Sequence, residues 1–145
     1  MTDVKTIKAG ESLESITLPP VSRIDLIKYA GASGDFNPIH TIDEEATAAG
    51  LPGIIAHGMW TMGNLTKLFT PYLEDGLVTD YQIRFRGMVF LDDVVTLHAT
   101  VKDRDEKTIT FEIGASKQNG DTALKGEAFT NYTALKKNNQ QPVQT

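Results

Sequence analysis

The sequence predicts a single α+β domain in which an antiparallel sheet is wrapped around one long central helix. From Gly58 to Leu73, apolar residues recur every three or four positions, which is the period of a helix with one broad apolar face. We expect this to be the longest helix, reaching about 20 Å before Pro71 and Gly76 end it. After Gly76 the apolar period changes to two, as in antiparallel strands that bury one face. Helices followed by a run of strands are typical of the α+β class.

A short helix is expected over residues 23–32, before the central one. Ser22 and Asp25 fit a capping box, and apolar residues then recur on one helical face. Gly31 and Gly34 are expected to end this helix.

Residues 35–40 are expected to form a rigid loop. Pro38 fixes its own φ and keeps the residue before it out of the helical region. Thr41 and Glu44 then resemble a second capping box, which predicts a short helix that ends near Gly50.

The second half of the chain is expected to form a four-stranded meander. Apolar side chains alternate over residues 81–85, 95–101 and 109–115, and a further strand is expected from about Ala123 to Ala134. Such a sheet leaves an edge strand, and two subunits can protect their edges by pairing them, so we expect a dimer.

Length and composition exclude several classes of protein. We expect one domain over residues 1–135 and a polar, disordered tail over 136–145. The net charge of -5, with no basic run longer than two residues, argues against a nucleic-acid partner. The absence of cysteine removes thiolate chemistry and is compatible with the cytosol. With no apolar stretch near the roughly 18 to 20 residues of a membrane span, we expect a soluble, cytoplasmic protein without a membrane partner.

The segment YAGASGDFNPIHTIDEEA, residues 29–46, is the strongest candidate for chemistry. A loop stiffened by Pro38 can turn Asp35 and His40 toward one water, and a carboxylate with an imidazole suits acid and base catalysis near neutral pH. The alternative is structural, because Asp-x-Asn-Pro is also good turn chemistry. The amide of Gly58, at the positive end of the central helix, favours the catalytic interpretation because it can stabilise an oxyanion.

The same segment, with Ala56-His57-Gly58-Met59, resembles the hydratase-2 or MaoC-like family. The resemblance extends more weakly through Arg84-Phe85-Arg86 to Thr100 and implies a hot-dog fold. It is greatest to short, single hot-dog dehydratases that act on (R)-3-hydroxyacyl thioesters. The positions that match the family's motif are Tyr29, Ser33, Gly34, Asp35, Asn37, Pro38, Ile39, His40 and Ala46.

The resemblance implies a role for each matching polar group. Asp35 and His40 would hold the catalytic water, the Gly58 amide would bind the thioester oxygen, and Asn37 would hold the loop in shape. The implied reaction is the hydration of a trans-2-enoyl thioester, of coenzyme A or acyl carrier protein, to the (R)-3-hydroxyacyl thioester. It implies no redox cofactor and no metal. A metal site formed by Asp35, His40 and His57 matches no metal motif, and His57 is expected to be a neutral, hydrogen-bonded structural residue.

Further substrate contacts are expected on the central helix and on the first long strand. By resemblance, Thr66 and Phe69 would lie near the acyl tunnel, although ordinary core packing explains them equally well. Trp60 departs from the family, because it is large for the start of a central helix, and it would either fill core space or shorten the acyl pocket. Arg84 and Arg86, with Lys102 and Arg104, match the phosphates of coenzyme A or of a carrier protein's phosphopantetheine, or they are solvated strand charges.

The sequence therefore predicts a homodimeric hydratase, or one half of a heterodimer with a related hot-dog subunit. One alternative is a thioesterase on the same fold, which directs water at the carbonyl. Another is a non-catalytic subunit that binds acyl chains beside a catalytic sibling.

Overall fold

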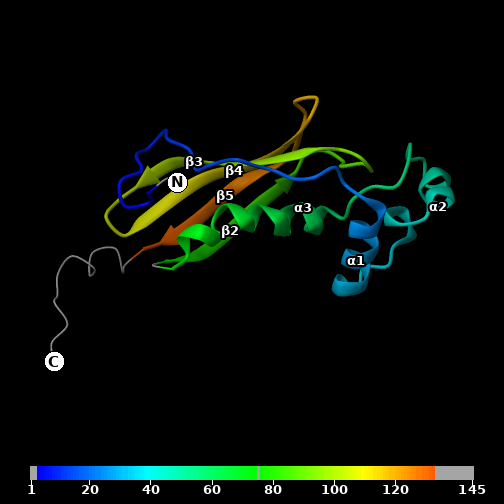
Figure 1. The fold of residues 1–145 in the computed structure, drawn as a ribbon, viewed down its shortest axis with the longest axis horizontal. Coiled ribbons are helices and arrows are strands. Elements are labelled where there is room, and N and C mark those ends of the chain that lie inside the picture. The colour runs from blue at the N-terminus through cyan, green and yellow to red at the C-terminus, as the bar shows by residue number, and fades with distance from the viewer. Residues whose placement is uncertain (1–2, 75, 133–145) are drawn as a thin grey trace.

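The structure, a computed structural model, describes residues 3–74 and 76–132. Its centre is one five-stranded antiparallel sheet, and Figure 1 shows the helix α3 lying along one face of it, with α1 and α2 beyond one end. This arrangement confirms the predicted α+β class. The strands are β1 (Ile16–Thr17), β2 (Leu77–Phe85), β3 (Val95–Arg104), β4 (Thr108–Lys117) and β5 (Thr122–Asn131).

The order of the strands differs from the predicted four-stranded meander. The order is β1-β3-β4-β5-β2, so β2 pairs with β5, and two strands separate it from β3, which follows it in the chain. Alternation along a strand fixes which residues face the core but says nothing of the neighbouring strand, which explains the error. The pairing of β1 with β3 was not predicted, because two residues are too short to show a period.

The helix α1 (Arg23–Ser33) begins as the sequence predicts. Ser22 Oγ accepts the Asp25 N–H at 3.2 Å, and the Asp25 carboxylate accepts the Ser22 N–H at 3.4 Å, which completes the capping box. Gly34 ends the helix with a φ of 76°, a left-handed conformation that glycine adopts without strain. Gly31 lies inside the helix and does not end it.

The second predicted capping box is not formed. The helix α2 (Asp43–Ala48) has Ile42 as its N-cap, with no hydrogen bond from a capping side chain. Thr41 instead ends a 3-10 turn, η1 (Pro38–His40), through a bond from its N–H to the Pro38 carbonyl. Because Thr41 closes one element, it is one position too early to open the next.

The central helical segment is divided into three parts. The helix α3 covers Gly58–Leu65, and two 3-10 turns follow, η2 (Thr66–Leu68) and η3 (Thr70–Tyr72). With eight residues, α3 is shorter than the eleven-residue α1, so the expectation of one longest, continuous helix is wrong. The Thr66 and Thr70 hydroxyls donate to the Gly63 and Thr66 carbonyls, and Pro71 lacks an N–H; both features oppose α-helical hydrogen bonding.

The core lies between this helical segment and the sheet. Leu65, Phe69 and Tyr72 keep the apolar stripe of the sequence buried across the break. The Phe69 ring meets that of Phe111 on β4 edge-on, with centroids 5.3 Å apart. On β3 the buried residues alternate with an exposed His98, as predicted.

Two predictions concern residues or properties outside this core. The tail, 136–145, and the end of the last predicted strand, 133–134, lie outside the described residues. In the part of the chain that the structure describes, no helix has the length and apolarity needed to cross a bilayer.

Candidate active site

The loop after α1 is held by three successive hydrogen bonds from side chains to the backbone. Ser33 Oγ accepts the Asp35 N–H at 3.1 Å, and Asp35 Oδ1 accepts the Asn37 N–H at 3.2 Å. Asn37 Oδ1 then accepts the Ile39 N–H at 3.2 Å. Each bond spans two residues, which is the geometry of Asx and Ser turns. The loop expected over residues 35–40 is therefore present at 35–37, whereas residues 38–40 form the 3-10 turn η1.

The two oxygens of Asp35 have different surroundings. Oδ1 belongs to the turn, whereas Oδ2 lies 3.9 Å from Nε2 of His40. That separation is too long for a direct hydrogen bond but lets both atoms reach one water at about 2.8 Å. The turn bond that the structural interpretation predicts therefore uses Oδ1 and leaves Oδ2 facing His40.

The backbone sets the direction in which His40 faces Asp35. His40 Nδ1 lies 2.7 Å from the Ile55 carbonyl, which can only accept, so Nδ1 carries a proton. The remaining nitrogen, Nε2, is therefore the one that can exchange a proton at the Asp35 side. The His40 side chain is 10% exposed and that of Asp35 is 52% exposed. The buried imidazole of His40 therefore meets the Asp35 carboxylate at the protein surface.

His57 lies behind this pair. Its ring stacks on that of His40, with centroids 3.8 Å apart and planes inclined by 22°, and the Tyr29 ring meets it edge-on. His57 Nε2 donates to the Asp35 backbone carbonyl at 3.1 Å. Its Nδ1 is buried without a hydrogen-bond partner among the described residues.

Asp35, His40 and His57 each bring one potential metal ligand to within 4.8 Å of the others. The orientations do not suit an ion, because imidazole lone pairs lie in the ring planes and two nearly parallel stacked rings cannot aim them at one point. One nitrogen of each ring is also bonded to a backbone carbonyl. The cluster is arranged for hydrogen bonding.

Gly58 is the first residue of α3, and its N–H makes no hydrogen bond to another described residue. Backbone N–H groups at a helix N-terminus carry partial positive charge and attract a developing oxyanion. A cavity of about 150 Å³ adjoins this residue, between the start of α3 and the end of β2. Its lining is largely apolar and includes Ala56, Thr61, Phe85, Met88, Val89 and Leu124.

The helical residues that the sequence places near the substrate do not line this cavity. Trp60 is half-buried against the core, and Phe69 is fully buried against Phe111. Thr66 is exposed, and its hydroxyl donates to the Gly63 carbonyl of α3. The cavity residues Phe85 and Met88 were missed, because only the fold brings them next to α3.

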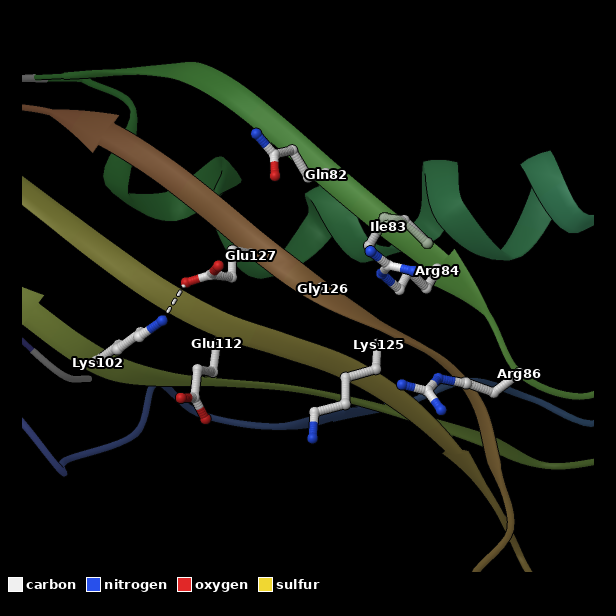
Figure 2. Close-up of a pocket in the computed structure, with 9 residues that line it drawn as sticks. All are labelled: Gln82, Ile83, Arg84, Arg86, Lys102, Glu112, Lys125, Gly126 and Glu127. Carbon is white, nitrogen blue, oxygen red and sulfur yellow. Dashed lines mark hydrogen bonds and ion pairs between the residues drawn. The ribbon is translucent and has the colours of Figure 1, made fainter.

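Arg84 and Arg86 lie on the outer face of the sheet. Side chains alternate along a strand, so these two face away from Phe85, whose ring reaches Gly58. Figure 2 shows them with Lys125 over a hollow of about 670 Å³ on the side of the sheet opposite α3. Of the other cations considered, Lys102 pairs with Glu127 at 2.9 Å, and Arg104 donates to the Val4 and Ile7 carbonyls.

Comparison with curated proteins gives relatives of two kinds. The (R)-specific enoyl-CoA hydratase of Rhodospirillum rubrum is 28% identical over 126 residues, which are 84% of this chain and 85% of that protein. The fatty acid synthase subunit beta of Aspergillus oryzae is 31% identical over 109 residues, which are 72% of this chain. This chain spans only 5% of the length of that fungal subunit.

Solved structures share the fold. An (R)-hydratase from A. caviae involved in PHA biosynthesis superposes with a TM-score of 0.77 at 23% identity, covering 88% of this chain and 98% of that one. An unliganded R-hydratase from Pseudomonas aeruginosa gives a TM-score of 0.75 at 25% identity, covering 86% and 81%. The architecture is thus the hot-dog fold of these hydratases. Residues 5–121 also match the MaoC like domain, and the chain belongs to this MaoC-like dehydratase family.

Proposed function

We propose that this chain catalyses the reversible hydration of trans-2-enoyl thioesters to (R)-3-hydroxyacyl thioesters. The proposal depends above all on the 3.9 Å separation of Asp35 Oδ2 from His40 Nε2. The Gly58 amide, which has no hydrogen-bond partner among the described residues, and the apolar cavity beside it also support the proposal. The family to which the chain belongs supports it as well.

In the hydration direction, one water is held between Asp35 and His40. Asp35 takes a proton from this water as its oxygen bonds to Cβ of the enoyl group. The protonated His40 gives its Nε2 proton to Cα, while Nδ1 keeps its bond to the Ile55 carbonyl. The product has gained one water. The next water held between the two groups returns the proton from Asp35 to His40 Nε2, and dehydration follows the same steps in reverse. An acid-base group of this kind contributes typically about 10² to 10⁴ in rate.

The Gly58 amide acts on the negative charge that develops between the attack of water at Cβ and the proton transfer to Cα. Attack at Cβ moves negative charge onto the thioester oxygen, as in an enolate, and an N–H at that oxygen stabilises the charge. Removal of one such donor costs about 10² to 10³ in kcat in enzymes where it has been measured.

The size of the cavity beside Gly58 gives an expectation for the length of the acyl chain. A volume of about 150 Å³ suffices for a ligand the size of benzene, so we expect substrates of about four to six carbons. The thioester carrier is coenzyme A or acyl carrier protein. A phosphate contact to Arg84 or Arg86 would require the carrier's arm to pass the edge of β2, because these residues lie on the opposite face from the cavity.

We further propose that the chain assembles as a dimer through β2. Among the described strands, β2 is at the edge of the sheet, where its outward backbone groups can bond a second strand, and exposed Leu77 and Phe85 would be covered. The partner is a second copy of this chain or a related hot-dog subunit; one neighbour in fold is the ChsH1-ChsH2 complex of Mycobacterium tuberculosis. Sedimentation of the purified chain distinguishes these two partners. A chain that pairs with itself sediments as a dimer, whereas a chain that needs the related subunit sediments as a monomer when it is alone.

The purified chain with crotonyl-CoA provides the test. We expect the enoyl absorbance to fall without release of free thiol and the product to be the (R) enantiomer. His40→Gln is expected to abolish this signal, and His98→Gln, on the outer face of the sheet, serves as the matched control. Thiol release would indicate a thioesterase instead. No reaction until a sibling subunit is added would indicate the non-catalytic alternative.

A further inference from the structure

His57 is buried at 2% exposure and takes no part in the proton transfers proposed above. It nevertheless contacts both residues that do. Its ring stacks on the His40 ring, and its Nε2 donates to the Asp35 carbonyl. The groups facing it are the Tyr29 ring from α1, the His40 ring from η1 and the backbone of the Asp35 loop.

The hydrogen bond from His57 to the Asp35 carbonyl joins the loop after α1 to the start of α3. The three turn bonds of the loop run from one loop residue to the next, so they stiffen the loop without fixing it to α3. His57 is the N-cap residue of α3 and directly precedes Gly58. Its side chain therefore ties the Asp35 peptide to the residue that carries the oxyanion donor.

The unpartnered Nδ1 of His57 shows that packing alone does not explain this residue. A buried polar atom without a partner destabilises the folded state, and an apolar side chain of similar size would avoid that cost. The atom that does have a partner, Nε2, is the one bonded to the Asp35 carbonyl.

We infer that His57 is a positioning residue, which fixes the Asp35 carboxylate relative to the Gly58 amide through its Nε2–H and holds the His40 ring by stacking. The inference builds on the proposed hydratase function. Two carbonyls then impose opposite tautomers on the stacked rings, Nδ1–H on His40 and Nε2–H on His57. An error of about 1 Å in the placement of reacting groups costs about 10² in rate.

Two amide substitutions separate the hydrogen bond from the packing. The amide nitrogen of His57→Gln reaches the position of Nε2, whereas that of His57→Asn stops at the position of Nδ1. We expect His57→Asn to lower kcat about tenfold or more with KM little changed, and His57→Gln to recover most of that loss. His98→Asn and His98→Gln make the same exchanges on the outer sheet face and should leave kcat unchanged.

A third variant tests whether the role is only structural. His57→Leu removes the unpartnered nitrogen together with the Nε2 donor, so we expect a thermal midpoint equal to or above that of the wild type and a lower kcat. A loss of kcat that follows the thermal midpoint across the three variants would overturn the inference. Equal activities of His57→Gln and His57→Asn, or a rise in KM at constant kcat, would also contradict it.

The imidazole nitrogen chemical shifts provide a test that needs no substrate. The chain has three histidines, so the resonances can be assigned by comparing His57→Gln and His98→Gln with the wild type. With the imidazoles neutral, we expect the Nε2–H tautomer at His57 and the Nδ1–H tautomer at His40. An Nδ1–H tautomer at His57 would refute the inference. An inactive wild type with the expected tautomers would support the contact and contradict only the hydratase proposal.

Discussion

The ring of Phe85 lies directly over Gly58, where a β-carbon would come within 2.9 Å of Phe85 Cε1. Gly58 thus offers its backbone amide, and its lack of a side chain also leaves room for the Phe85 ring, which is part of the cavity wall. We expect Gly58→Ala to move the ring or the start of α3 and to lower kcat/KM, by up to about the 10² to 10³ typical of a lost oxyanion donor. Steady-state kinetics with crotonyl-CoA measures this effect.

Two variants check the cause of that loss. Gly63→Ala lies in the same helix with nothing within 4 Å of the added carbon, so it should keep full activity and gain about 0.5 to 1 kcal/mol of stability. Adding Phe85→Leu to Gly58→Ala relieves the contact and should recover part of the activity. A fully active Gly58→Ala would argue against an oxyanion role for this amide.

Asp35 can be divided into its two roles by substitution. Asp35→Asn keeps an oxygen that accepts the Asn37 N–H but loses the carboxylate, so we expect an unchanged thermal midpoint and a kcat reduced by about 10² to 10⁴. Asp35→Ala removes the turn bond as well and should also cost about 1 kcal/mol of stability. Chemical unfolding and kinetics on the same samples give both quantities. An Asp35→Asn variant within a few fold of wild-type kcat would exclude Asp35 as the base.

Apart from the fold class, the parts of the structure that the sequence predicts correctly are local ones. The start of α1 follows from a hydrogen bond between Ser22 and Asp25, and the loop geometry follows from bonds that span two residues. The facing of Asp35 toward His40 was predictable for the same reason, since only five positions separate them in a loop stiffened by Pro38.

Features that depend on distant segments were not predictable from the sequence. The apolar period of β2 shows that it is half-buried but does not show that it pairs with β5 instead of β3. The lining of the cavity by Phe85 and Met88 follows from that pairing, so these residues could not be chosen before the fold was known. The Thr41 capping box failed because a preceding turn had already engaged that residue.

The acyl-chain preference should respond to residues of the cavity wall. Met88 lines the cavity, so Met88→Ala enlarges the space beside Gly58 and should raise kcat/KM for an eight-carbon enoyl-CoA relative to crotonyl-CoA. Met59 lies on α3 and is 55% exposed, outside the cavity, which makes Met59→Ala the matched control. An unchanged ratio in Met88→Ala, or an equal change in both variants, would show that another part of the protein sets the chain length.

Asp93 connects the loop beside the cavity to β4. One of its oxygens accepts the Phe90 N–H at 2.7 Å and lies 3.0 Å from Lys117 Nζ, and the other accepts from Gln118 at 2.8 Å. Lys117 also donates to the Met88 carbonyl. Burial alone would raise the pKa of Asp93, but the hydrogen bonds from Gln118, the Phe90 amide and Lys117 hold it below its usual range.

The lowered pKa makes this contact sensitive to acid. The unfolded chain binds a proton at Asp93 near pH 3.9, whereas the folded chain binds it only at lower pH, so the contact stabilises the fold fully above about pH 5. That stabilisation is lost as the pH falls through the folded-state pKa. We expect the free energy of unfolding of the wild type to fall between about pH 5 and pH 3, and that of Asp93→Asn to start lower and fall less steeply. Urea unfolding across this range tests the point, and parallel curves for the two proteins would show that other carboxylates cause the acid sensitivity.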